Sequence, residues 1–150
     1  MSEHAEGCRR DDSRLTDSEL VRKLLWDCFP EKRKEILDLE EGYVTPEDPS
    51  PKLGAYTLAS EIFVESVLTP LLDATPVIDD ELAKRCSVFL ELLLGSGRPF
   101  LKEMTSIRIT DHLLGYPGNW MIFQKYAGNL LLCEVRERRP YYKGPFSDLE

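Results

Sequence analysis

Asp111 and His112 are the only adjacent aspartate and histidine in the sequence, and such a pair could carry acid–base chemistry. If the surrounding stretch TSIRITDHLLGYP, residues 105–117, were a strand, the pair would sit at a strand end, where an acid–base dyad can work. In a helix, adjacent side chains point about 100° apart and cannot hydrogen-bond as the carboxylate and imidazole of a catalytic dyad do. The secondary structure of this stretch therefore decides whether the pair is a candidate site.

The residues around this pair predict a helix. Gly97-Arg98-Pro99 supplies a helix start with proline near the first position, and GYPG at 115–118 supplies an end. A strand would be only about five residues long, and no partner strand is evident elsewhere in the sequence. At about 100° per residue, the helix has one mainly apolar stripe made of Phe100, Met104, Ile107, Asp111 and Leu114. Because Ile109 and Leu113 lie on the opposite side, the helix is expected to pack between neighbours.

The position of Asp111 on this apolar stripe predicts a carboxylate that is at least partly desolvated and needs a hydrogen-bond donor. Arg108, three residues earlier, is the nearest candidate donor. We therefore expect Asp111 and Arg108 to form a structural polar anchor, since buried polar groups are usually satisfied in this way. The alternative is a small intracellular enzyme with a pocket around Asp111 and His112. Its other groups would be drawn from Arg108, Tyr116 and Cys86.

Cysteine and histidine spacing gives little basis for a metal or redox site. The four cysteines are far apart, and no C-x-x-C motif is present. Cys28, Cys86 and Cys133 stand in apolar segments, which predicts reduced, buried and inert thiols. His4 and Cys8 are spaced to hold a metal from a helix, but so polar an N-terminal tail is more typical of disorder. Without nucleotide-loop, nucleophile-elbow or metalloprotease motifs, we expect no metal, no cofactor and no catalytic residue.

The charge balance argues against nucleic acid and membranes as partners. The chain carries 27 acidic and 19 basic side chains, a formal net charge of −8, which repels phosphate backbones and anionic lipid headgroups. RRPYYKG at 138–144 mixes cations with aromatics, as nucleic-acid-binding segments do, but pairing with the acidic body is favoured. No stretch approaches the roughly 20 apolar residues of a membrane span, and the N-terminus lacks a signal peptide's apolar core. The sequence therefore predicts a cytoplasmic protein.

Start and stop signals divide the first half of the chain into helices. Thr16 and Glu19 form a predicted capping box, which begins a helix that ends near Pro30. Pro30 opens a second helix that Gly42 stops, so the two helices should form a hairpin. VTPEDPSPK at 44–52 is expected to be a stiff connector, because each of its three prolines lacks a backbone donor and restricts the residue before it.

The second half continues the same pattern. Residues 53–72 carry apolar side chains at helical spacing and predict the third helix. Asp79 or Asp80 is placed to cap the fourth helix, which GSG at 95–97 stops. The helix around Asp111 is the fifth, and residues 119–135 form a sixth that a glycine and an asparagine interrupt.

These elements predict an all-α single domain of about six helices in short-looped hairpins, either a small helical bundle or a short α-solenoid. Residues 1–14 are expected to be a disordered or loosely packed tail, 15–139 the helical domain, and 140–150 a C-terminal strap or tail. Such an architecture offers a broad face for interaction.

The most acidic exposed positions are the candidates for a partner-binding surface. Glu61 and Glu65 are a like-charged i, i+4 pair on the outer side of the third helix, which costs a few tenths of a kcal/mol unless a partner relieves it. The full candidate set is Glu61, Glu65, Asp73, Asp79, Asp80 and Glu81. An acidic surface of this kind suits a basic partner, because complementary fields accelerate encounter.

Several segments resemble a family of short bacterial all-helical proteins, some of which are suspected to be toxin-immunity proteins. The resemblance covers roughly Leu20 to Val135. It rests on LVRKLLWDCFPEKRKEI, CSVFLELLLGSG, IRITDHL and KYAG, whereas the proline-rich connector and the RERRPYYKGPF tail depart from the family pattern. The resemblance implies a non-enzymatic protein-binding domain, and in its most specific form an immunity protein that neutralises a bacterial toxin. The acidic charge of the chain would suit a basic toxin. The resemblance supplies no catalytic residues.

Overall fold

The computed structural model describes residues 12–74 and 77–142, and every regular element within them is helical. The all-α fold predicted from the sequence is confirmed, with about eight helices in place of six. Part of the difference lies near the C-terminus, where the predicted sixth helix is two helices. The chain turns at Gly128 between α9 (Pro117–Phe123) and α10 (Asn129–Arg138).

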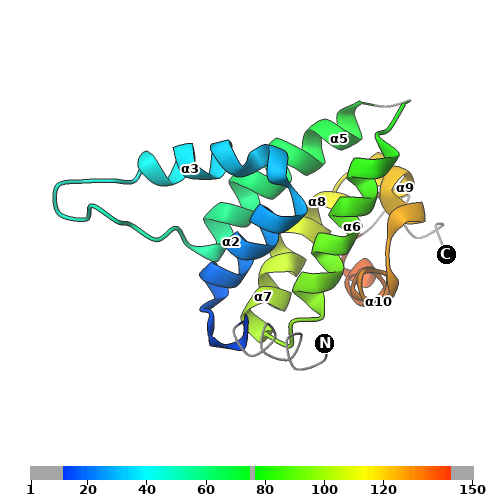
Figure 1. Ribbon diagram of the computed structural model, residues 1–150. Helices are drawn as coiled ribbons and strands as arrows, with labels where there is room; N and C mark the ends of the chain where they lie inside the picture. Colours follow the sequence, from blue (N-terminus) through cyan, green and yellow to red (C-terminus); the bar gives the residue numbers. More distant parts are fainter. Residues whose placement is uncertain (1–11, 75–76, 143–150) are drawn as a thin grey trace, which may run out of the picture.

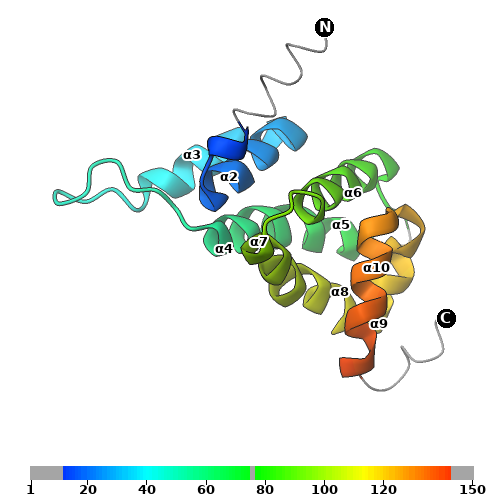
Figure 2. The ribbon, with the colours of Figure 1, turned by 90° about the horizontal axis from the view of Figure 1, so that it is seen from below.

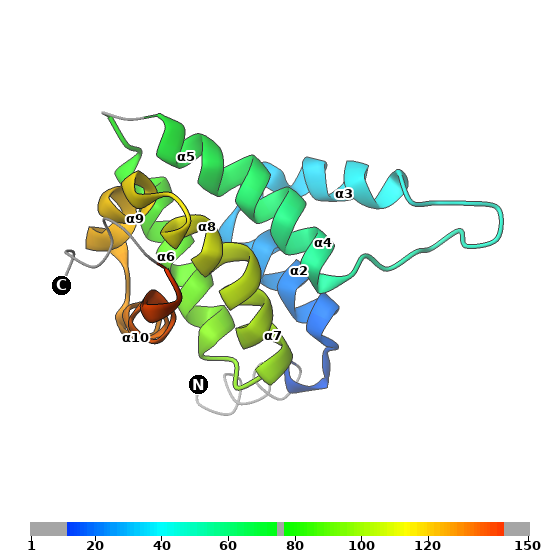
Figure 3. The ribbon, with the colours of Figure 1, turned by 180° about the vertical axis from the view of Figure 1, so that it is seen from behind.

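The first hairpin forms as its cap residues predict. α2 (Asp17–Cys28) begins with a capping box, in which Thr16 Oγ1 accepts from the Glu19 amide at 3.1 Å and Glu19 Oε1 accepts from the Thr16 amide at 2.9 Å. A 3-10 turn, η1 (Pro30–Lys32), leads into α3 (Arg33–Glu41). The exposed connector after α3 extends away from the helices, as Figures 1 and 3 show.

Two long helices in the middle of the fold each contain a segment with wider, i to i+5, hydrogen bonding. The first runs through α4 (Ala55–Thr57), η2 (Leu58–Leu68) and α5 (Thr69–Asp73). By length and composition it could cross a membrane, and half of its apolar window is buried inside this fold. The second runs through α7 (Pro99–Met104), η3 (Thr105–Thr110) and α8 (Asp111–Leu114).

α6 (Asp80–Leu94) lies against α2 on one side and α10 on the other. Seen from below, α2 and α3 lie at one side of the molecule and α9 and α10 at the other, with the long helices between them (Figure 2). Gly97, which follows α6, has φ 74°, a conformation that glycine adopts without steric cost. This glycine lets the chain reverse direction into α7.

A cluster of aromatic rings joins the end of α2 to η2 and α6. Phe29, Phe63 and Phe89 come from the end of α2, from η2 and from α6, and their ring centroids are 4.7 to 5.9 Å apart. All three are fully buried. Tilted and edge-to-face contacts at these separations are favourable for aromatic side chains. The cluster therefore fixes how the end of α2 packs on η2 and α6.

Two arginines attach α6 and the turn after it to opposite ends of α2. Arg85 donates to the Cys28 carbonyl at 3.1 Å and pairs with Glu31 and Glu81. Arg98 donates to the Leu15 carbonyl at 2.7 Å and also pairs with Asp17. Since each guanidinium bonds to both a backbone carbonyl and a carboxylate, the two contacts set the position of α2 along its axis.

The N-terminus of α10 is capped from another helix. Gly128 at the N-cap position has no side chain, and Glu91 of α6 accepts from the Leu130 amide at 3.1 Å and the Leu131 amide at 2.9 Å. A Cβ at Gly128 would lie 2.5 Å from the Glu91 carboxyl carbon. Glycine at this position therefore makes room for the carboxylate.

Candidate functional site

A hollow of about 680 Å³ lies between α2, the end of α3 and the connector. We call it the α2–α3 groove. Its lining is largely apolar: Leu15, Trp26, Val44, Pro49, Pro51, Leu53 and Leu58. A volume of this size falls in the range of ligand sites. The proline-rich connector, which was predicted to be only a stiff link, forms one wall of the groove.

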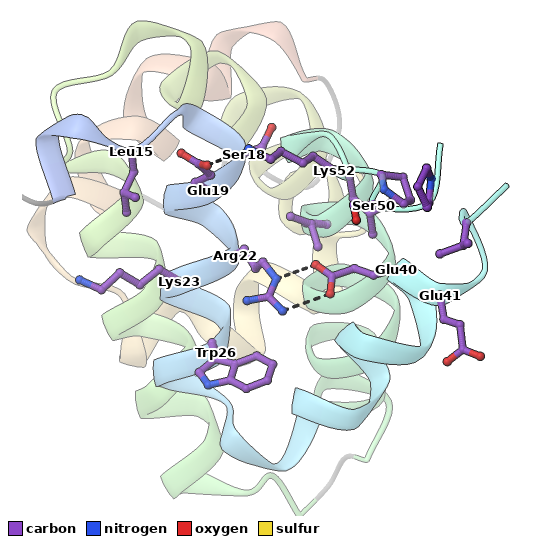
Figure 4. A pocket seen from close by; sticks show the side chains of 15 residues that line it. Leu15, Ser18, Glu19, Arg22, Lys23, Trp26, Glu40, Glu41, Ser50 and Lys52 are labelled. Atoms are coloured by element: carbon purple, nitrogen blue, oxygen red, sulfur yellow. Dashed lines mark hydrogen bonds and ion pairs between the residues drawn. The ribbon is translucent and has the colours of Figure 1, made fainter. Parts of the chain in front are cut away.

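An ion pair crosses the groove and joins its two helices. Arg22 of α2 donates to Glu40 of α3 through Nε at 2.6 Å and through Nη2 at 3.1 Å, as Figure 4 shows. These hydrogen bonds raise the pKa of Arg22. The bidentate geometry holds the Arg22 guanidinium 4.8 Å from the centroid of the Trp26 ring, and the Arg33 guanidinium lies 5.2 Å from the same centroid. Trp26 is therefore held in a fixed, partly exposed position at the groove.

A second ion pair stands at the connector side of the groove. Lys52 Nζ lies 3.3 Å from Glu19 Oε2. The capping hydrogen bond with Thr16, and then Lys52, lowers the pKa of Glu19. The Lys52 side chain is 79% exposed and that of Glu19 36%, so this pair contributes little to stability. Its position does tie the connector to α2.

The groove continues into an acidic surface along α3. Glu41 lines both the groove and a smaller hollow of about 350 Å³ with Asp38 and Gly42. Asp38 in turn lines a hollow of about 380 Å³ with Glu35, Leu39, Glu61 and Ile62. We call Glu35, Asp38, Glu41 and Glu61 the α3 acidic edge.

The charges on the α3 acidic edge are only partly neutralised. Glu35 pairs with Lys32 at 3.0 Å, and Asp38 pairs with Lys34 at 2.9 Å. Bonds from Ser66 and Lys32 lower the pKa of Glu35. Glu41 and Glu61 form no ion pair with any residue of the described ranges 12–74 and 77–142. The edge therefore presents uncompensated negative charge beside an apolar groove.

The six acidic residues predicted as a binding surface are all exposed, but the structure divides them. Glu61 joins the α3 acidic edge, and Glu65 is exposed one turn farther along η2. Asp73 ends α5, and its charge acts on His112.

The remaining three members stand at the start of α6 and have structural roles. Asp79 caps α6 by accepting from the Leu82 amide at 3.1 Å, as its position predicted. Asp80 accepts from the Tyr126 hydroxyl, and this bond raises the pKa of Tyr126 to about 12. Glu81 pairs with Arg85 at 2.9 Å. Sequence reasoning found these acids but missed the α3 residues beside the groove, whose charges lie in a segment that looked like an ordinary amphipathic helix.

The predicted burial of Asp111 is wrong, because Asp111 is exposed, as are Phe100 and Ile107 of the same predicted stripe. The stripe was drawn for about 100° per residue, whereas η3 has i to i+5 bonding and so carries more residues per turn. The buried face therefore turns to Met104, Thr105, Ile109 and Thr110.

Asp111 nevertheless anchors the end of the chain. Its carboxylate accepts from the Tyr142 hydroxyl at 2.5 Å, and burial together with this bond raises the pKa of Tyr142. The predicted partner Arg108 is instead exposed, with its guanidinium 5.3 Å from the centroid of the Tyr56 ring. Tyr142, near the start of the predicted C-terminal strap or tail, packs against the core, and residues 143–150 of that segment lie outside the described residues.

His112 is partly buried, and burial lowers its pKa. Its Nε2 lies 3.2 Å from Thr69 Oγ1, and its ring centroid is 5.7 Å from that of Tyr116. Asp73 and Asp111 act on it through charge alone. Neither Asp111 nor His112 lines the groove or the two smaller hollows.

The buried polar anchor of the helix formed by α7, η3 and α8 is Glu134 and not Asp111. Glu134 of α10 is 3% exposed, and one of its carboxylate oxygens accepts from the Ser106 hydroxyl and, at 3.1 Å, from the Thr110 hydroxyl. Charge-assisted bonds of this kind offset part of the cost of burying a carboxylate. The sequence signal would have been a serine and a threonine four residues apart facing an acid in another helix.

The three cysteines of the described residues, Cys28, Cys86 and Cys133, are free, as predicted, but their burial differs. Cys86 is buried and Cys28 half-buried, and burial raises the pKa of Cys86 to about 12. Cys133 is exposed, so the expectation that it is a buried thiol is wrong; α10 turns Leu131, Glu134 and Val135 inward instead. His4 and Cys8 lie outside the described residues. Within the described part of the chain, no group of three metal-ligating side chains comes together.

No family model matches the chain, and neither a curated protein nor a solved structure shows significant similarity to it. The resemblance to bacterial helical proteins therefore stays a prediction, and function has to be argued from the groove and the acidic edge.

Proposed function

We propose that this chain is a non-enzymatic protein-binding domain that recognises a basic partner. The observation that carries the proposal is the continuity of the α2–α3 groove with the α3 acidic edge through Glu41. Apolar surface supplies affinity, and complementary charge supplies rate and specificity. The formal net charge of −8 acts in the same direction over longer distances.

Neutralisation of a basic bacterial toxin in the cytoplasm is the sharpest form of this proposal. An acidic inhibitor gains rapid association with a basic toxin, because opposite fields steer the two proteins together. The resemblance to suspected immunity proteins supports this form. The second acidic surface, at Asp73 and Asp79 to Glu81, is the alternative place for the partner to bind.

The competing proposal, an enzyme built on Asp111 and His112, has less support from the contacts. His112 touches Tyr116 and Thr69, but Asp111 is directed to Tyr142 and Arg108 to Tyr56. Cys86 is buried in the core against α2 rather than exposed for chemistry. The groups needed for one catalytic pocket are therefore engaged in separate places.

Affinity capture from the source cells, using the full chain as bait, tests the proposal. We expect one specific basic protein, whose recovery falls with added salt because charge pairing is screened. The double variant Asp38→Lys, Glu41→Lys should reduce recovery, and the triple reversal of Asp79, Asp80 and Glu81 separates the two acidic surfaces. Glu103→Lys, an exposed reversal on α7, is the matched control.

Each variant needs a thermal melt first, since Asp79 caps α6 and Glu81 pairs with Arg85. Recovery of no partner, or of a partner that ignores both sets of reversals, would contradict binding through acidic charge.

A further inference from the structure

We propose that the α2–α3 groove binds an amphipathic helical segment of the partner, with apolar side chains in the groove and lysine or arginine side chains along the α3 acidic edge. This inference rests on the proposed function and names the element that is recognised. It assigns the specificity to Val44 and Trp26 for the apolar contact and to Asp38 and Glu41 for the charge contact.

The shape of the site favours a helix over an extended strand. An extended strand would need a sheet edge, and the described residues contain no strand. The groove is open to solvent beside α2 and α3 and is continued by two further hollows, so it suits an elongated occupant better than a closed-in small molecule. Laying an apolar helix face into such a groove is a recurrent mode of recognition.

The charge pattern favours a basic segment. Glu35, Asp38 and Glu41 follow one another at three-residue spacing, which is about 4.5 Å along a helix axis per step. Basic residues three or four apart on a partner helix repeat at nearly the same interval. Three cations line the groove, and all are already paired within this chain: Arg22 with Glu40, Lys23 with Asp12 and Lys52 with Glu19.

The groove also presents contacts typical of binding hot spots. Trp26 is partly exposed and held in place by its neighbours, so little side-chain entropy is lost when a partner covers it. Val44 is 48% exposed at the edge of the connector. Burying both against a partner removes apolar surface from water at a site that is already formed.

Synthetic peptides of about 14 residues, long enough to become helical on binding, test the inference with the full chain. The first has leucine on one helical face and lysine on the other. The second replaces every lysine with glutamate, and the third has the first peptide's composition without helical periodicity. Isothermal titration calorimetry should show binding of the first peptide, with the second and third at least about tenfold weaker.

Variants locate the binding. Val44→Asp should weaken the leucine–lysine peptide about tenfold or more, and Asp38→Lys with Glu41→Lys should weaken it similarly while improving binding of the leucine–glutamate peptide. Val88→Asp on α6, which is 53% exposed, and Glu103→Lys are matched controls that should change nothing. All five positions are exposed, so the variants are expected to fold.

Four outcomes overturn the inference. The first is no binding of the leucine–lysine peptide at about 100 µM, which means a binding free energy weaker than about −5.5 kcal/mol. The second is equal binding of the three peptides, and the third is binding that Val44→Asp leaves unchanged. The fourth is a change of oligomeric state in the Val44→Asp variant, which would show that a second copy covers the groove. If the peptides fail while the native partner is still captured through acidic residues, the proposed function stands and this inference falls. If the peptides bind the groove while capture fails, the helix-binding inference stands and the proposed function falls.

Discussion

Glu40 and Glu134 are both glutamates that hold two helices together, yet their surroundings differ. Glu40 forms a bidentate ion pair with Arg22 at a groove that is open to water, and its side chain is 24% exposed. Glu134 is 3% exposed and bonded to the hydroxyls of Ser106 and Thr110. The first arrangement leaves surface available for a partner, whereas the second uses polar groups entirely within the fold.

Different kinds of contact stabilise the two sides of the molecule. The α9 and α10 side is held by polar contacts between its helices and their neighbours, which Glu134 and Glu91 make. The α2 and α3 side is held by the aromatic cluster and by arginines, with several charges remaining exposed around the groove. Stability and binding are therefore expected to respond to different substitutions.

The largest effect is expected from Glu134→Ala, which removes the acceptor of two buried hydroxyls and leaves a cavity. We expect a loss of about 2 to 3 kcal/mol in the free energy of unfolding, measured by urea denaturation. Replacing all three polar residues, as Glu134→Leu with Ser106→Ala and Thr110→Val, should recover most of that loss. No buried polar group is then left without a partner. A triple variant less stable than the single one would contradict this explanation.

The next effect concerns the cap of α10. Glu91→Ala removes the acceptor for two amides and should cost about 1 kcal/mol, and Gly128→Ala should cost at least as much because its methyl group would displace the Glu91 carboxylate. Thermal melts followed by circular dichroism measure both. The double variant should be less destabilised than the sum, because either change disturbs the same contact.

A smaller effect is expected at the groove. Glu40→Gln weakens a partly exposed ion pair and should lower the free energy of unfolding by less than about 1 kcal/mol, with the effect reduced in high salt. It should nevertheless alter peptide binding, since Arg22 is released beside Trp26. A stability loss as large as that of Glu134→Ala would remove the contrast between the two regions.

The smallest effect is the pH dependence due to His112. Burial lowers its pKa in the folded state, so the neutral form is favoured there and the unfolded chain binds protons first. Its contribution to stability is complete above the unfolded pKa near 6.5 and is lost as pH falls through the folded pKa. His112→Gln should flatten the stability profile below pH 6.5, in urea melts run from pH 7.5 to 5. An unchanged slope would contradict this assignment.

Local signals in the sequence predicted those features that depend on neighbouring residues. The Thr16 and Glu19 capping box and the Asp79 cap are confirmed, because both partners lie within three residues. The burial of Asp111 was predicted wrongly because the periodicity argument assumed uniform α-helical turns, and η3 departs from them. The exposed Cys133 shows the same dependence on how a helix is rotated against its neighbours.

Sequence by itself determined the helical class, most helix boundaries, the paired helices and the acidic charge, since propensity, caps and periodicity act over one or two turns. Only the tertiary structure decided that the proline-rich connector and Trp26 line one groove, that Glu41 continues it into an acidic edge, and that Glu134 meets Ser106 and Thr110. These contacts join residues 24 or more positions apart in several cases, such as Thr110 and Glu134. Their formation depends on how whole helices pack, a global balance of burial and polar satisfaction that no local pattern encodes.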